Sequence, residues 1–447
     1  MNKYKLFIFL FFMLSLIIFA DEKAEESKSL EEERLETIRY GIDSQVMDLI
    51  KNLVIEKNYE FNKDLVKLLE SSTNSRLDES IISLLDNSED DSAVEYIFNK
   101  LQEDYNLRDN IRVVYINYIS KYQTLEISEY FLELIEEESN SVSIASIKAL
   151  GKSELEHIIP TLIDYLEDSL FDSLRKPAII ESLGKLKAYE ALEILTDIAT
   201  DIYSDDKSLR WRSVVALGEI GSPESLPILK SLFSDEDPNL RNYTISALKN
   251  FPSKEVEKLL IQGLKDSYWK VRVQAAESLG ELGSKEAIGI LIYKSENDPD
   301  IRNVRSSALN ALGDIGGSEA FEHLRKMYQN ERTDISLRYI AIQILAEKDL
   351  SNSLKIIDKV IKDEWDKDKS FILDYTCKIL SSTKNSSLKE TYLKMLSYES
   401  TYNLKLYALR GIKLNSLASL KQEVEKLTSE DTPATVKKLA IDVMKSF

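Results

Sequence analysis

The stretch LRWRSVVALGEIGSPESLPILKSLF, from Leu209 to Phe233, recurs twice further along the chain with small changes. VRVQAAESLGELGSKEAIGILIY begins at Val271, and VRSSALNALGDIGGSEAFEHLRKMY begins at Val304. A phrase that recurs about every 32 residues and consists of two helical segments is typical of a stacked solenoid rather than of a compact globule. The repeat therefore decides the architecture before any single residue is considered.

The same register extends over most of the chain. The residue after the last helical leucine marks each copy, at intervals of about 31 to 35 residues. The marks are Gly151, Gly184, Gly218, Lys249, Gly280, Gly313, Ala346, Ser381, Lys413 and Lys445, with weaker copies at Ser120 and Asp86. We predict an all-α fold, a right-handed α-solenoid of about twelve stacked antiparallel helix pairs.

Each repeat contains the signals of two helices and a tight turn. Val271, Ala275 and Leu279 lie on one stripe of the first helix, and the small alanine allows a neighbouring helix to approach closely. Glycines such as Gly221 and Gly283 tolerate the left-handed conformation that ends a helix. The second helix is therefore expected to fold back antiparallel to the first.

The phrase D-x-x-L/V-R-x-x-A-x-x-x-L-G, followed by a helix near Ser-Pro-Glu, resembles the HEAT repeat in the short form of the phycobilisome lyases. The resemblance is clearest over residues 170–345 and weakest over residues 40–140. It implies an α-solenoid whose arginine-bearing helices line the concave side. It also implies a role in protein binding, here in an exported bacterial member of the class.

An arginine recurs at one position of the repeat. This arginine ladder consists of Arg112, Arg210, Arg241, Arg272, Arg305 and Arg338. The resemblance implies that such an arginine pairs with an aspartate of an inter-helix turn and joins one repeat to the next, while a basic stripe for an anionic partner is the alternative. The candidate aspartates are Asp237, Asp266, Asp300 and Asp334. Exposed pairs contribute only about 0 to 1 kcal/mol, so apolar contacts should dominate the stacking.

Side chains next to the ladder are expected to face the concave groove and to bind the partner. The predicted partner-binding residues are Trp211, Asn242, Lys270, Val273, Glu277, Asn303, Ser306, Asn310, Tyr339 and Gln343. Aromatic side chains such as Trp211 and Tyr339 are good anchors because they dominate interface energetics. The alternative is that both rings fill gaps between repeats.

Residues that could support catalysis are few. His157 and His323 are the only histidines, and Cys377 is the only cysteine. Two histidines on separate repeats cannot build the multi-ligand site that a transition metal needs. Cys377 stands among apolar helical residues and is predicted to be buried. We therefore expect no enzyme, no catalytic residue, no cofactor and no metal.

The N-terminus has the pattern of a secretory signal. Lys3 and Lys5 precede an apolar run over residues 6–19, and Ala20 stands before the acidic Asp21. A basic start, an apolar core and a small residue predict cleavage between Ala20 and Asp21. The run is shorter than the about 20 residues of a membrane span, although an uncleaved anchor is the alternative. The protein is expected to be periplasmic in a two-membrane bacterium and secreted otherwise.

The composition leads to a division of the chain into segments. These are a signal peptide (1–20), an acidic flexible or helical leader (21–39), degenerate repeats (40–140), well-defined repeats (141–345) and divergent repeats with a terminal cap (346–447). We interpret the leader as a solvated tether, and the alternative is a docking arm for a basic partner.

The charge balance limits the partners. With 58 basic and 77 acidic residues, the net charge of −19 repels nucleic acids and anionic membranes. The sequence predicts an exported, non-enzymatic scaffold that binds a protein or peptide through its concave face, with no membrane insertion after cleavage. The alternatives are a cofactor-handling lyase or other HEAT-like enzyme, and a self-associating component of the cell envelope.

Overall fold

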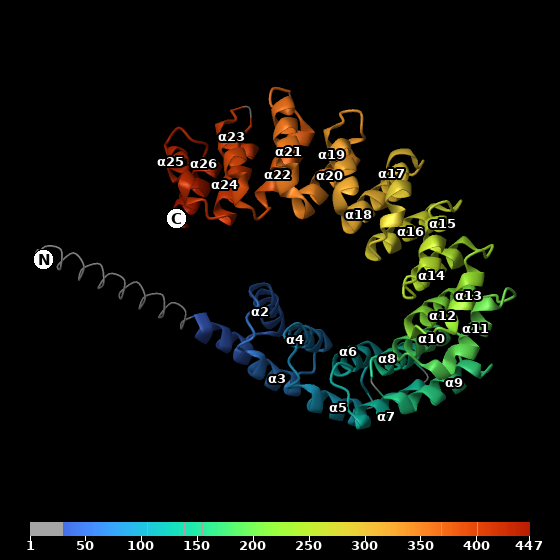
Figure 1. The fold of residues 1–447 in the computed structure, drawn as a ribbon. Coiled ribbons are helices and arrows are strands. Elements are labelled where there is room, and N and C mark those ends of the chain that lie inside the picture. The colour runs from blue at the N-terminus through green and yellow to red at the C-terminus, as the bar shows by residue number, and fades with distance from the viewer. Residues whose placement is uncertain (1–29, 105, 137–138, 154, 368, 400) are drawn as a thin grey trace, which may run out of the picture. The chain divides into compact units, whose positions relative to one another are not determined.

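The computed structural model describes residues 30–447 except 105, 137–138, 154, 368 and 400, so the predicted signal peptide and cleavage site lie outside the described residues. The described residues form helices and no strand (Figure 1). The chain divides into two compact units, residues 1–216 and 217–447, and the boundary falls within helix α12 (Lys207–Ile220). Each unit is described separately.

The first unit is a stack of helices in two layers. A helix over residues 30–40, which includes the end of the predicted leader, precedes the stack and buries Ile38. The inner layer consists of α2 (Asp43–Glu56), α4 (Ser75–Asn87), α6 (Asp109–Ile119), α8 (Asn140–Leu150) and α10 (Lys176–Lys185). The outer layer consists of α3 (Asn62–Ser71), α5 (Val94–Glu103), α7 (Leu125–Glu133), α9 (Ile159–Glu167) and α11 (Leu192–Thr200).

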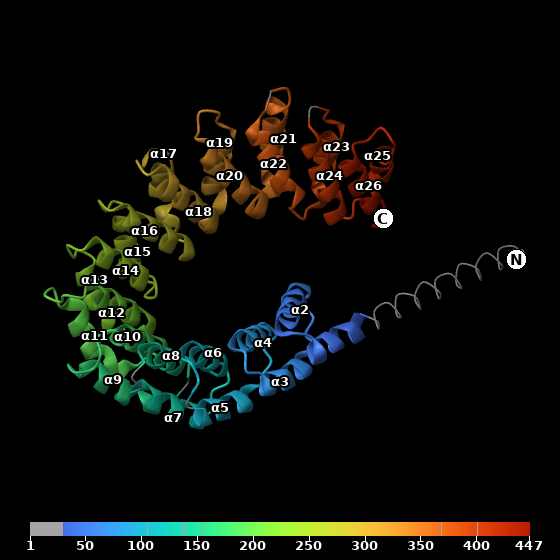
Figure 2. The same ribbon diagram turned by 180° about the vertical axis from the view of Figure 1, so that it is seen from behind.

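The second unit has the same two layers, which remain distinct when the view is reversed (Figure 2). Its even-numbered helices are α14 (Pro238–Leu248), α16 (Trp269–Glu281), α18 (Ser306–Ile315), α20 (Ile335–Lys348), α22 (Phe371–Ser381), α24 (Tyr402–Leu414) and α26 (Ala434–Lys445). Its odd-numbered helices are α13 (Ser225–Leu232), α15 (Lys254–Gly263), α17 (Ile288–Asn297), α19 (Gly317–Gln329), α21 (Leu350–Glu364), α23 (Lys389–Ser397) and α25 (Lys421–Lys426).

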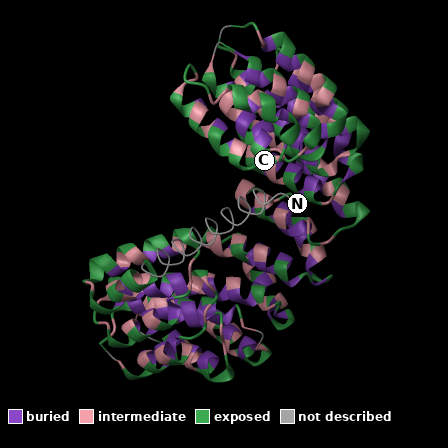
Figure 3. Ribbon diagram, turned by 90° about the vertical axis from the view of Figure 1, so that its left-hand side faces the viewer, coloured by how far each residue is buried: buried purple, intermediate pink, exposed green. Residues whose placement is uncertain are grey.

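The predicted helix pairs are confirmed. Among the described residues, twelve pairs run from α2/α3 to α24/α25, and each even-numbered helix of a unit contacts the next even-numbered one. Buried residues lie on the helix sides that face neighbouring helices, and exposed residues lie on the outer sides (Figure 3). Apolar side chains between the layers therefore form one continuous core along each unit.

The glycines that mark the register let adjacent inner-layer helices touch. A Cβ at Gly218 would lie 2.7 Å from the Cβ of Ala247, and one at Gly280 would lie 2.9 Å from the Cα of Ala311. Real Cβ atoms do not approach other atoms so closely, because overlap of this kind costs about 1 to 3 kcal/mol in a packed interior. At Gly218 and Gly280, the spacing between successive repeats therefore leaves no room for a side chain.

The predicted turn conformations are present. Gly221 and Gly283 have φ values of 71° and 64°, in the left-handed region that favours glycine. Asp237 then caps α14, accepting a hydrogen bond from the backbone N–H of Asn239 at 2.9 Å.

The arginine ladder connects turns of successive repeats. Arg241 donates to both carboxylate oxygens of Asp266, at 2.8 and 2.9 Å, and to the carbonyl oxygen of Asp235 in the turn before its own helix. Arg272 likewise donates to both carboxylate oxygens of Asp298, at 2.9 and 2.8 Å, and to the carbonyl oxygen of Asp266 in the turn before its own helix. One guanidinium therefore holds two consecutive turns together.

One of the four candidate aspartates, Asp266, is confirmed as an arginine partner, and the other three cap helices. The partner of Arg272 is Asp298 and not Asp300, because Asp300 caps the following π-helical segment (Ile301–Arg305) through the N–H of Asn303. Asp334 caps α20 through the N–H of Ser336, and Arg305 donates instead to the carbonyl of Asp298. The arginine-paired aspartates also accept backbone N–H groups in their own turns, Asp266 from Tyr268 and Asp298 from Asp300.

Two further ladder residues, Arg210 and Arg338, donate to backbone carbonyls, and Arg338 also lies 3.9 Å from the carboxylate of Glu364. Arg210 donates to the carbonyl of Ala199 at 3.0 Å, and Arg338 donates to that of Tyr328 at 2.9 Å. Arg112 is half-buried beside the end of α5. The structure adds Arg175, one residue out of register, whose guanidinium donates to the carbonyl of Ile135 at 2.7 Å.

Candidate functional site

The solvent-facing side of the even-numbered helices of unit 2 gathers most of the predicted partner-binding residues. On α16, α18, α20 and α22, exposed or half-buried residues recur about every three to four positions along one side of the helix, while most of the remaining residues are buried. This surface, called the inner face below, lies on the side of the layer away from the odd-numbered helices (Figure 1).

The structure places eight of the ten predicted residues on the inner face, and a ninth, Asn303, in the π-helical segment directly before α18. The exposed ones are Lys270, Glu277, Asn303, Asn310 and Gln343. The half-buried ones are Asn242, Val273, Ser306 and Tyr339. Trp211 is half-buried on α12 and belongs to the other unit.

A row of tyrosines crosses the inner face near the C-terminal end. Tyr339 on α20 stacks on Tyr375 of α22, with ring centroids 4.0 Å apart and planes at 22°. Tyr407 occupies the same turn of α24 and is also half-buried. Burial, with the charge of Asp374 next, raises the pKa of both Tyr339 and Tyr407. The tyrosine row, Tyr339, Tyr375 and Tyr407, therefore presents partly exposed aromatic rings on three adjacent helices.

Both signs of charge occur on the inner face. On α16, burial and then the charge of Glu281 raise the pKa of Glu277, and the ammonium of Lys270 lies 5.7 Å from the centre of the Trp269 ring. One turn beyond the tyrosine row, the exposed residues are Gln343 on α20, Lys378 on α22 and Arg410 on α24. The face thus carries both signs of charge on α16, whereas Lys378 and Arg410 are exposed cations on α22 and α24, with the half-buried Asp374 one turn before Lys378.

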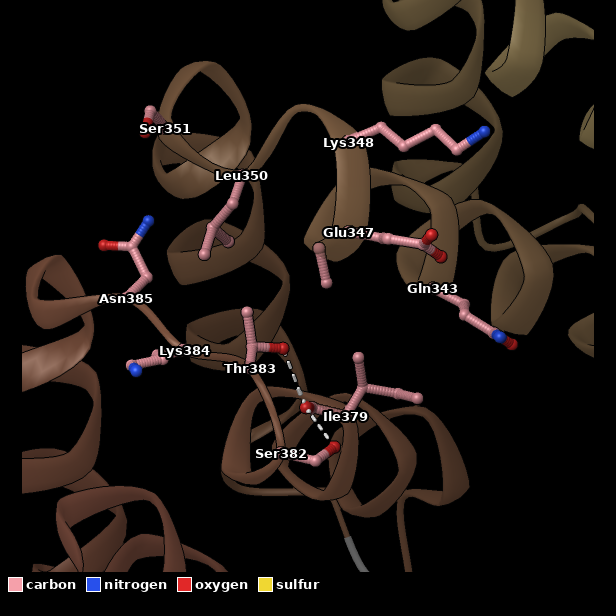
Figure 4. Close-up of a pocket in the computed structure, with 11 residues that line it drawn as sticks. Gln343, Glu347, Lys348, Leu350, Ser351, Ile379, Ser382, Thr383, Lys384 and Asn385 are labelled. Atoms are coloured by element: carbon pink, nitrogen blue, oxygen red, sulfur yellow. Dashed lines mark hydrogen bonds between the residues drawn. The ribbon is translucent and has the colours of Figure 1, made fainter. Parts of the chain in front are cut away.

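A hollow of about 590 Å³ opens at one edge of this face, between the C-terminal ends of α20 and α22. Gln343 and Glu347 stand on one side of it and Asn385 on the other (Figure 4). The hydroxyls of Ser382 and Thr383 donate to the carbonyl oxygen of Ile379, each at 3.0 Å. These hydroxyls satisfy the end of α22, so the hollow has a polar rim but no converging set of ligand-binding groups.

The two histidines lie apart from the inner face. His323, on the outer helix α19, is buried, and its Nε2 lies 2.8 Å from the hydroxyl of Ser295. Burial lowers the pKa of His323, and the carboxylate of Glu296, 3.7 Å away, partly opposes this shift. His157 is exposed in another repeat. Within the described part of the chain, no three His, Cys, Asp or Glu residues are grouped so that they could hold a metal ion.

Cys377 is completely buried, as predicted, and burial raises the pKa of its thiol. Trp269 at the start of α16 and Trp365 after α21 are half-buried, and the ring of Trp365 packs edge-on against that of Tyr398, with centroids 4.6 Å apart.

Sequence reasoning missed Tyr375 and Tyr407. In their repeats Leu373 and Lys405 occupy the ladder position, and each tyrosine stands two residues after it rather than one, as Tyr339 does after Arg338. The signal that remained is the spacing of the tyrosines themselves, which is 36 residues from Tyr339 to Tyr375 and 32 residues from Tyr375 to Tyr407, close to the repeat length.

The stacked helix pairs, the glycine contacts between inner helices and the arginine connections between turns together define an α-solenoid of the HEAT type. The chain matches the family model for spirochaete HEAT repeat proteins over residues 38–443. It belongs to that family. No curated protein sequence matches it.

The chain is also similar to solved structures at low identity. The Kap95:Nup1 complex matches with 13% identity and a TM-score of 0.51, over 88% of this chain and 62% of that chain. The CpcE–CpcF complex of phycocyanin lyase from Nostoc sp. PCC7120 matches with 17% identity and a TM-score of 0.34, over 60% of this chain and 94% of that one. Human deoxyhypusine hydroxylase with glycerol matches with 17% identity and a TM-score of 0.27, over 62% and 99%.

Proposed function

We propose that the protein is a non-enzymatic scaffold that binds a protein or peptide partner through the inner face of unit 2. The tyrosine row carries this proposal. Tyrosine anchors dominate interface energetics because they bury a large apolar ring at little entropic cost, and three adjacent helices here present one each. The stack of Tyr339 on Tyr375 holds these two rings in place before binding, which lowers the cost of ordering them.

The proposal includes export, which rests on the amino-acid sequence. Lys3, Lys5 and the apolar run over residues 6–19 have the order of a signal peptide, with cleavage after Ala20. In the part of the chain that the structure describes, helices of bilayer-spanning length and hydropathy are absent. N-terminal sequencing of the protein recovered from the cell envelope tests the cleavage, and recovery of a peptide that spans Ala20 and Asp21 would contradict it.

The binding surface is tested by crosslinking in intact cells followed by mass spectrometry. Substitution of Tyr339→Ala and Tyr375→Ala together should abolish the crosslink to the partner while the helical content stays unchanged. Tyr293→Ala is the matched control, because Tyr293 is 60% exposed on the odd-numbered helix α17. Retention of every crosslinked partner by the double variant would show that the inner face is not the binding surface.

The non-enzymatic part of the proposal has a separate test. Purified protein should contain no stoichiometric metal or chromophore, and its melting temperature should not rise with small-molecule cofactors. A bound metal or chromophore at one equivalent would instead favour a cofactor-handling enzyme.

A further inference from the structure

The C-terminal end of the inner face is basic in a protein whose net charge is −19. Helices α24 and α26 carry six cationic residues and one carboxylate, that of Asp442. The cationic residues are Lys405, Arg410, Lys413, Lys437, Lys438 and Lys445. Lys378 on the adjacent helix α22 extends the group. We call these seven cations the basic end.

Most of the basic end lacks the ion pairs that neutralise cations on other inner helices. Lys249 pairs with Glu281 at 2.8 Å, and Lys348 pairs with Asp314 at 2.5 Å. In the basic end only Lys413 forms such a pair within the described residues, with Asp442 at 2.7 Å. Lys378, Arg410 and Lys438 are exposed, and no carboxylate lies within 4.0 Å of their charged nitrogens in the described part of the chain.

Apolar surface lies directly beside these cations. Tyr375 precedes Lys378 by three residues, and Tyr407 precedes Arg410 by three, so each ring and its cation are neighbours on one helix face. Ile441 on α26, 41% exposed, stands one turn from Lys438. The basic end therefore combines positive charge with apolar anchoring area on one continuous layer of helices.

We propose that the basic end binds an acidic peptide segment of a partner protein, one in which Asp or Glu residues alternate with apolar side chains. This inference rests on the proposed function and specifies its partner. The carboxylates would contact Lys378, Arg410 and Lys438, and the apolar side chains would pack on Tyr375, Tyr407 and Ile441.

The net charge of the chain separates this partner from nucleic acids and lipid bilayers. A polyanion of high charge density experiences the negative charge of the whole protein as well as the local cations. A short acidic peptide experiences mainly the charges within a Debye length, about 8 to 10 Å at physiological salt. The apolar side chains of the peptide also pack on the tyrosine row, whereas a charged phosphate backbone does not pack on these rings.

The test uses the full chain and fluorescence anisotropy with three labelled probes. These are a Glu/Leu peptide, a Ser/Leu peptide of equal length and a single-stranded oligonucleotide. We expect saturable binding of the Glu/Leu peptide alone, weakening between 50 and 200 mM salt as screening increases. Equal binding of the Ser/Leu peptide would overturn the charge requirement. Tighter binding of the oligonucleotide, or of anionic phospholipid vesicles in a co-sedimentation assay, would overturn the choice of a peptide.

Charge reversal locates the site. Lys378→Glu with Arg410→Glu should weaken binding of the Glu/Leu peptide by about tenfold or more, because like charges then oppose each other across the interface. Lys258→Glu on the odd-numbered helix α15, also exposed, is the matched control. Undiminished binding by the double variant would overturn the assignment of this site.

The crosslinking experiment distinguishes the two proposals. If Tyr339→Ala and Tyr375→Ala abolish the cellular crosslink while Lys378→Glu and Arg410→Glu retain it, the binding function stands and the acidic-partner inference fails. If neither pair of substitutions changes the crosslink, the inner face itself is not used.

Discussion

Removal of Arg272 should destabilise the second unit far more than removal of a surface lysine. The guanidinium is 7% exposed and donates to both oxygens of Asp298, which is 2% exposed. Breaking a buried pair by removing one member costs about 3 to 5 kcal/mol, because the other charge stays buried without its partner. Lys294, 3.1 Å from Asp298, still compensates part of that charge in the variant. We therefore expect Arg272→Met to lower the free energy of unfolding by about 3 kcal/mol.

The assay is urea denaturation of Arg272→Met at pH 7, with unfolding monitored by circular dichroism. Lys249→Met is the control and should cost at most about 1 kcal/mol, because its pair with Glu281 is partly exposed. Asp298→Asn in the Arg272→Met background should recover part of the loss, since the uncompensated charge is removed. A loss below about 1 kcal/mol for Arg272→Met would refute the claim that the ladder holds consecutive repeats together.

The same pair predicts a pH dependence. Burial alone would raise the pKa of Asp298, but hydrogen bonds from Arg272 and the N–H of Asp300 bring it below its ordinary value of 3.8. The carboxylate therefore contributes stability above pH 3.8, and this contribution is lost as the pH falls through the lower folded-state value. The difference between the wild type and Arg272→Met should shrink over this acidic range.

Three further predictions concern packing and titration. Gly280→Ala should destabilise the protein by about 1 to 3 kcal/mol in urea denaturation, because the new Cβ would overlap Ala311. The control Gly289→Ala, with no atom within 4 Å of the new methyl group, should be neutral or should stabilise the protein by up to about 1 kcal/mol. Equal effects of the two substitutions would contradict the close approach of the helices. Since burial lowers the pKa of His323, its protonation favours the unfolded chain, so stability should fall as the pH drops below about 6.5. His323→Gln should flatten that fall in urea titrations at pH 7.5 and 5.0, and the exposed His157→Gln should leave it unchanged. The thiol of Cys377 should react with a chromogenic disulfide reagent only in denaturant, and rapid reaction in buffer would contradict its burial.

The fold could be predicted from the sequence because the same residue pattern occurs in several copies along the chain. Val271, Ala275 and Leu279 mark the buried stripe, and Gly283 marks the turn, so each copy confirms the register of the others. The pairing of Arg272 with Asp298 rather than Asp300 could not be predicted in this way. Both aspartates stand in the same turn, and which one caps the next helix depends on backbone geometry.

The candidate site was predicted only where the repeat is regular. Tyr339 follows a ladder arginine and was found by counting. Tyr375 and Tyr407 stand two residues after the ladder position of their repeats, where the arginine is replaced by a leucine and a lysine. Only the three-dimensional layer of helices brings these tyrosines beside Tyr339. A ring contact such as that between Tyr339 and Tyr375, which lie in different repeats, depends on the rotation between helices and not on either local sequence.

The connections between repeats are local along the chain, and this has a mechanical consequence. The amide of Asn250 donates to the carbonyl of Gly218, and that of Asn415 donates to the carbonyl of Thr383, each across 32 residues. Since each bond joins only neighbouring repeats, pulling on the two ends loads these bonds in series. A stretched molecule should therefore lengthen elastically at low force and then lose helix pairs one at a time, with the remaining repeats still folded.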